Sequence, residues 1–190
     1  MLDHLRPAVV LLVLMTVITG VAYPLLVTGI AQSTMAGKAD GSLIFKDGKA
    51  IGSALVGQGF SDPKYFWGRP SATAPFAFNA DASSGSNQGP TSKALADAVA
   101  DRVKTLREAD PANQGPVPVD LVTASASGLD PHISPAAAEY QAGRVAAARK
   151  LAPARVRELV ARHTEPRTLG LLGEPRVNVL RLNLELDAIR

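Results

Sequence analysis

A long stretch without any charged side chain, residues 7–37, restricts the fold of this chain more than any other feature. Its densest part, residues 8–31, is largely aliphatic, and as a helix it would reach roughly 36 Å. That length crosses the roughly 30 Å hydrocarbon layer of a membrane with some tilt. Backbone polar groups in lipid must be paired within the segment itself. The sequence therefore predicts one transmembrane helix over residues 8–31, with a kink at Pro24.

The flanks of this span predict its orientation. Arg6 directly precedes the span, whereas no basic residue follows it before Lys38. Because basic residues near a span favour the cytoplasmic side, we expect residues 1–7 in the cytoplasm and residues 32–190 outside. That places a single-pass protein in the inner membrane, with a soluble extracytoplasmic (periplasmic) domain. A cleaved signal peptide is the alternative, but its apolar core is normally about 7–15 residues long.

The remaining composition excludes several function classes. The net charge of +3 is mild, and no run of Lys or Arg is interleaved with aromatic residues, so we predict no nucleic-acid partner. The absence of cysteine excludes disulfides, thiolate chemistry and cysteine-based metal sites. With only three histidines, we also predict no metal site.

Turn and periodicity signals predict a mixed α+β domain after the span. Asp47-Gly48 lies between two short β-prone runs, which indicates a hairpin, because both turn residues need positive φ. Further strands are expected over residues 54–60 and 119–123. Strict alternation of leucine and polar residues over 180–186 predicts a half-buried strand.

Three helices complete the expected domain. The first is indicated by apolar residues at helical spacing, namely Leu95, Val99, Val103 and Leu106. The second begins at Ser134-Pro135, because Ser is a good N-cap and Pro suits the first helical position. The third begins near Pro153.

Most aromatic residues of the domain fall in one irregular segment, residues 60–82. They include Tyr65, Phe66, Trp67, Phe76 and Phe78. A loop of this kind can fill the core, or it can form a surface for a partner, where aromatic residues concentrate. We favour the first interpretation.

Two residue sets keep a membrane-anchored serine hydrolase open as an alternative function. Ser61 and Lys64 match the S-x-x-K pair of penicillin-interacting enzymes, although K-T-G is absent and Pro63 separates the two residues. Ser127 and His132 lie close together in the sequence, but without a G-x-S-x-G elbow. Capping by Ser and Asp around the start of a helix explains the second set without chemistry.

A polar loop is the candidate nucleotide-associated site. It comprises Ser84, Gly85, Ser86, Asn87 and Gln88. Its backbone N–H groups could face a phosphate, and a helix is expected to follow. No lysine is placed as in a P-loop, so a plain solvated loop is the other interpretation. The chain also lacks the Asp-Lys-Thr-Gly-Thr run of P-type pumps, and it cannot run that ATPase cycle by itself.

These residues together resemble the C subunit of the bacterial Kdp potassium-transporting ATPase. The matching runs cover nearly the whole chain in family order. They are RPAVVLLVLMTVITGVAYPLLVTGIAQ, GSALVGQGFSDPKYFWGRPSAT, ASSGSNQGPTSKAL, PVDLVTASASGLDPHISPAAAEYQAGRVAAARKL and LGLLGEPRVNVLRLNLELD. The loop at residues 83–87 matches only in part, since the family usually reads SGGSN there.

The resemblance implies a non-catalytic subunit of a high-affinity, ATP-driven potassium importer. The implied partners are a channel-like potassium-binding subunit, a P-type ATPase subunit and a small single-span subunit. The family role is that of a catalytic chaperone that promotes ATP binding by the ATPase subunit, so ATP belongs to the complex and this chain alone holds no cofactor. Since ATP is cytoplasmic and the domain is expected outside, we expect an indirect effect on ATP affinity and a domain that caps the outer mouth of the potassium subunit.

Overall fold

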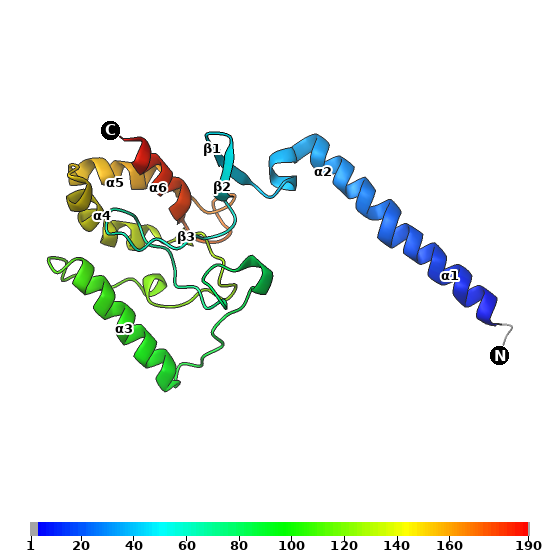
Figure 1. Cartoon of the computed structure of the whole chain (residues 1–190), viewed down its shortest axis with the longest axis horizontal. Coiled ribbons are helices and arrows are strands. Elements are labelled where there is room, and N and C mark those ends of the chain that lie inside the picture. The colour runs from blue at the N-terminus through cyan, green and yellow to red at the C-terminus, as the bar shows by residue number, and fades with distance from the viewer. Residues whose placement is uncertain (1–3, 190) are drawn as a thin grey trace. The chain divides into compact units, whose positions relative to one another are not determined.

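The structure is a computed structural model that describes residues 4–189 (Figure 1). It combines helices and sheets with one long apolar N-terminal helix, which confirms the expected α+β class. The chain forms two units, of which the first ends at Ile51 and the second begins at Gly52.

The first unit contains one long helix, Leu5–Ala39, of 35 residues, in which an 18-residue window has a mean hydropathy of 2.4. It is long and apolar enough to cross a membrane. It consists of α1 (Leu5–Val17), the π-helical turn η2 (Ile18–Ala22) and α2 (Tyr23–Ala39). The π turn ends two residues before Pro24, whose ring disturbs the regular hydrogen-bond pattern of the preceding turn. The backbone leaves helical dihedral angles at Met35. The kink expected at Pro24 stays a prediction.

A β-hairpin follows the helix, as the turn signal predicted. Its strands are β1 (Leu43–Lys46) and β2 (Lys49–Ser53). Asp47 and Gly48 between them have φ of +50° and +75°, the left-handed values that a two-residue turn of this type requires.

The second unit contains the three expected helices and one more. They are α3 (Lys93–Ala109), α4 (Pro135–Arg149), α5 (Pro153–Arg162) and α6 (Val179–Ala188). Ser134 caps α4 as predicted, because its hydroxyl accepts a hydrogen bond from the Ala137 N–H at 3.0 Å.

A small antiparallel sheet joins these helices. Its order is β3-β5-β4, with β3 (His132–Ile133), β5 (Arg176–Asn178) and β4 (Thr164–Glu165). The strands expected over residues 54–60 and 119–123 are wrong. The first region is a turn and irregular chain. The second begins with a 3-10 turn, η4 (Val119–Leu121), and another 3-10 turn, η3 (Ala80–Ala82), lies earlier.

The strand expected over residues 180–186 is also wrong, since this segment lies within α6. The side chain of Asn178 accepts a hydrogen bond from the Arg181 N–H and caps the helix. Val179, Leu182, Asn183 and Leu186 are buried, a spacing of three and four residues that belongs to a helix. Leucine is a good helix former, so alternation alone was a misleading signal.

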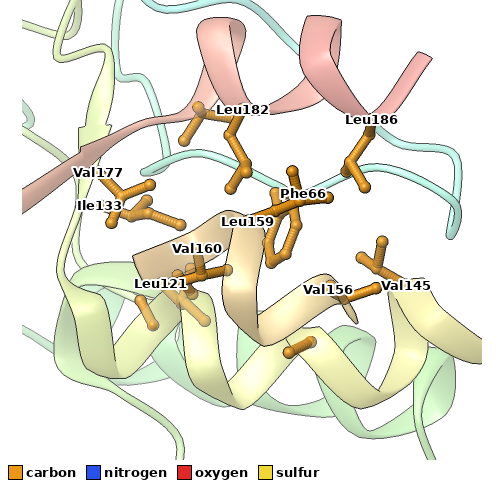
Figure 2. Close-up of a cluster of buried hydrophobic side chains, with 14 of the residues drawn as sticks. Phe66, Leu121, Ile133, Val145, Val156, Leu159, Val160, Val177, Leu182 and Leu186 are labelled. Carbon is orange, nitrogen blue, oxygen red and sulfur yellow. The ribbon is translucent and has the colours of Figure 1, made fainter. Parts of the chain in front are cut away.

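The core lies between α4, α5 and α6, and Figure 2 shows the ring of Phe66 among side chains from these helices. Phe66 is fully buried, and Phe60 and Trp67 pack against the same cluster. The core-filling interpretation of the aromatic segment is therefore confirmed for these residues, whereas Phe76 is exposed.

Candidate functional site

Residues 60–69, here called the anchored segment, have no regular secondary structure and yet place the fully buried Phe66 in the core of the domain. Such a segment has no neighbouring strand to pair its backbone groups, and unpaired buried groups are costly. Polar side chains of α4 and α6 supply the missing partners. The local order of the domain therefore depends on contacts between residues far apart in the sequence.

Among the charged side chains that contact the anchored segment, Arg144 of α4 is the most buried. Its guanidinium donates to the carbonyl oxygens of Pro63 and Tyr65, at 2.6 and 3.1 Å, and to Gln141 Oε1 at 2.7 Å. It also stacks on Trp67, 4.2 Å from the ring centroid. Burial lowers the pKa of Arg144 to about 10, against the opposing attraction of Asp110 and Asp62, so it stays charged at neutral pH.

Two side-chain amides act on the anchored segment as a neighbouring strand would. Asn183 accepts from the Phe66 N–H and donates to the Phe66 carbonyl, both at 2.9 Å. Gln141 accepts from the Trp67 N–H at 2.8 Å and donates to the Trp67 carbonyl at 3.1 Å. Each amide thus satisfies both backbone groups of one residue and fixes its orientation.

Arg149 and Asp187 hold the outer part of the anchored segment. Arg149 Nε donates to the Lys64 carbonyl at 2.7 Å, and its Nη2 pairs with Asp187 Oδ1 at 2.7 Å. The Tyr65 hydroxyl donates to the other oxygen of Asp187 at 3.1 Å. Helices α4 and α6 are linked through this arrangement.

Arg69, at the end of the anchored segment, pairs with Asp130 at 3.1 Å, and His132 Nδ1 lies 3.5 Å from the same carboxylate. Burial opposes ionisation of Asp130, but the hydrogen bonds from His132 and Arg69 outweigh it and lower its pKa below the usual 3.8. Arg69 Nε is buried without a hydrogen-bond partner among residues 4–189.

A cavity of about 250 Å³ lies beside this cluster. Phe60, Trp67 and Leu106 are among its apolar lining residues, and Arg69 and Arg102 contribute charge. Arg102 donates to the Val122 carbonyl at 2.8 Å and Arg69 to the Ala124 carbonyl at 3.4 Å, so both guanidiniums hold the adjacent loop.

The residue pairs of the hydrolase alternative are engaged elsewhere. Lys64 pairs with Asp62 at 3.2 Å, and in the described part of the chain it shares no hydrogen bond with Ser61. The Ser127 hydroxyl accepts from the Leu129 N–H at 3.1 Å, while the ring of His132 faces Asp130. These contacts are the turn and capping interactions that we expected for this segment.

The predicted nucleotide-associated loop lies against residues 126–127. The Ser84 N–H donates to the Ser127 carbonyl at 3.1 Å, and a Cβ on Gly85 would lie 2.8 Å from the Ala126 carbonyl oxygen. Glycine is therefore required at Gly85 by close backbone packing. Ser84, Ser86, Asn87 and Gln88 are exposed, and α3 begins only at Lys93.

The sequence analysis missed the polar anchors of the domain, namely Gln141, Arg144, Arg149, Asn178 and Asn183. One signal could have revealed some of them. Gln141 and Arg144 share a face with Ala137, Ala138 and Val145 of α4, and a polar residue on an apolar helix face needs a buried partner.

The fold and these contacts define a class of protein: a chain with one N-terminal helix able to span a membrane, followed by one small α+β domain. The family model described as K+-transporting ATPase, c chain, matches residues 5–188. The chain belongs to this family.

Relatives named potassium-transporting ATPase KdpC subunit match over 97–100% of their length. The protein of Methylococcus capsulatus is 64% identical over 190 residues and 100% of both chains. That of Dechloromonas aromatica is 65% identical over 185 residues, 97% of each chain. That of Serratia proteamaculans is 56% identical over 189 residues and 100% of both chains.

Proposed function

We propose that this chain is a non-catalytic accessory subunit that stabilises a high-affinity, ATP-driven potassium uptake complex and promotes ATP binding by its ATPase subunit. The observation that carries the proposal is the match of the c-chain family over residues 5–188, which includes both the apolar helix and the domain. Relatives named as subunits of a potassium-transporting ATPase support it further.

The proposed partners are a channel-like potassium-binding subunit, a P-type ATPase subunit and a small single-span subunit. The helix Leu5–Ala39 tethers the chain beside them in the inner membrane. Arg6 before the apolar stretch favours a cytoplasmic N-terminus, which leaves the domain in the periplasm.

This orientation separates the domain from cytoplasmic ATP. The domain then acts on ATP affinity through contacts with its partners, as a coupling free energy between two sites. We propose that it caps the outer mouth of the potassium-binding subunit. A domain whose central segment is held by Arg144, Gln141 and Asn183 is well suited to this, because a preorganised surface loses little entropy on binding.

A truncation tests the proposal. Residues 40–190 are deleted so that the helix Leu5–Ala39 remains, and the full-length chain with the same tag is the control. We expect a lower yield of assembled complex and loss of potassium uptake at micromolar potassium. Unchanged yield and uptake would refute the proposed function.

A further inference from the structure

Three leucines at the tip of a loop are unusually exposed. Leu169 and Leu171 are 87% and 80% exposed, the two largest values among the large hydrophobic residues of the described chain, and Leu172 is 63% exposed. We call residues 165–176 the leucine hairpin. Single exposed leucines are common on protein surfaces, but a contiguous apolar tip marks an interaction site.

The tip is held in one conformation by its own backbone. Thr168 and Leu172 exchange two hydrogen bonds, N–H to carbonyl in each direction, both at 2.9 Å. Leu169 has φ of +55°, a left-handed value that is rare for a residue with a branched apolar side chain. Because strained conformations of this kind concentrate at functional sites, the geometry points to a tip that is shaped for contact.

The stem of the leucine hairpin carries two ion pairs. Arg167 pairs with Glu174 at 2.6 Å, and Arg176 pairs with Glu165 at 2.9 Å. The stem therefore has no net charge, and residues 165–176 include no aromatic residue and no lysine. Segments that bind lipid surfaces usually combine apolar residues with a basic excess or with Trp and Tyr. A neutral leucine tip instead fits an apolar recess in another protein.

We propose that the leucine hairpin docks into an uncharged apolar recess on the extramembrane surface of another subunit of the same complex. This inference rests on the proposed function, since it requires that the chain assembles with other subunits. Beyond the proposed function, it names the leucine hairpin as the part of the domain that makes the contact and an uncharged apolar recess as the surface that receives it.

Site-specific photocrosslinking tests the contact directly. A benzoylphenylalanine is placed at Leu171 in the full-length chain, and in a control at Val119, which is 70% exposed elsewhere on the domain. After illumination of the purified complex, we expect an adduct of Leu171→benzoylphenylalanine with one other subunit and none from the control. An adduct with lipid only, or no adduct in an assembled complex, would overturn the proposal.

Substitution of the tip provides a second test. The triple variant Leu169→Ser, Leu171→Ser, Leu172→Ser removes the apolar tip, and Leu55→Ser, at a site 60% exposed, is the matched control. We expect the triple variant to keep the wild-type thermal transition and to dissociate from the complex at least about tenfold faster, whereas Leu55→Ser does not. Equal dissociation of both would contradict the docking role. If the wild-type chain itself fails to assemble with other subunits, the proposed function fails instead.

Discussion

The anchored segment and the tip of the leucine hairpin both lie outside the helices and named strands, and both carry large apolar side chains, but their surroundings are opposite. Phe66 in the anchored segment is fully buried, whereas Leu169 in the leucine hairpin is almost fully exposed. The backbone of the anchored segment is paired by side chains from α4 and α6. At the tip of the leucine hairpin, the residues from Thr168 to Leu172 form backbone hydrogen bonds within the hairpin itself.

This contrast shows that apolar content does not decide whether an irregular segment enters a core. Burial of such a segment requires partners for its N–H and C=O groups, and those partners must come from elsewhere in the chain. The anchored segment has these partners, and it belongs to the folding of the domain. The tip of the leucine hairpin forms backbone hydrogen bonds within itself and does not depend on side chains from the other elements that the structure describes. Its exposed leucines therefore remain available for another molecule.

The largest expected effect is that of Phe66→Ala. Truncation of a fully buried phenylalanine removes its burial and leaves a cavity, so we expect a loss of about 3–5 kcal/mol in the free energy of unfolding. Leu169→Ala should change it by less than about 0.5 kcal/mol. Denaturant titration of the purified full-length protein measures both, and equal losses would remove the contrast between the two segments.

Replacement of Arg144 tests whether the polar anchors maintain the buried segment. Arg144→Met keeps much of the side-chain volume but leaves the carbonyls of Pro63 and Tyr65 without this donor, so we expect a loss of about 2–3 kcal/mol. Arg155→Met is the control, because Arg155 is half exposed and its ion pair with Glu158 lies three residues away on the same helix. A loss no larger than that of the control would contradict the role of Arg144.

Asp130 provides a smaller, pH-dependent effect at the end of the anchored segment. The pKa of Asp130 is lowered in the folded protein, so its ionised carboxylate adds to the free energy of unfolding. This stabilisation is fully present above the unfolded-state pKa of about 4 and is lost as the pH falls through the folded-state pKa. The difference in unfolding free energy between wild type and Asp130→Asn should therefore shrink as the pH is lowered from 6 to about 3. A difference that stays constant over this range would show that the Arg69 and His132 contacts do not stabilise the charged form.

The smallest effect is expected at the stem of the leucine hairpin. Arg167→Gln breaks an exposed ion pair with Glu174, which should cost less than about 0.5 kcal/mol in global stability. Thermal unfolding of the variant beside wild type measures this change. A cost above about 2 kcal/mol would mean that the leucine hairpin is part of the cooperative core and does not differ from the anchored segment in this respect.

The elements predicted correctly are those with local signals. Asp47-Gly48 specified its hairpin through backbone conformation, and Ser134 specified the start of α4 through one cap. The segment 180–186 was misread because its alternation fits a strand, whereas the cap at Asn178 favours a helix. The contact between Asn183 and Phe66 joins residues 117 positions apart, so no pattern in either segment alone could predict it.

The candidate site was harder to predict than the fold. The loop from Ser84 to Gln88 was found by composition, but its contact with residues 126–127 depends on tertiary packing. The serine, lysine and histidine residues that suggested a hydrolase are close in sequence, but Lys64 pairs with Asp62 and the ring of His132 pairs with Asp130 instead. Spacing alone does not define such sites, because catalytic sets are defined by geometry.

The side of the membrane on which the domain lies tests the proposed capping role most directly, because a cap on the outer mouth of the potassium pathway must lie on the side opposite to ATP. The chain has no cysteine, so Ala100→Cys, on the exposed face of α3, is a unique label site, and His4→Cys serves as the control at the other end. We expect a membrane-impermeant maleimide to label Ala100→Cys in intact spheroplasts, and His4→Cys only after lysis. Labelling of Ala100→Cys only after lysis would contradict the account and would favour direct contact of the domain with ATP.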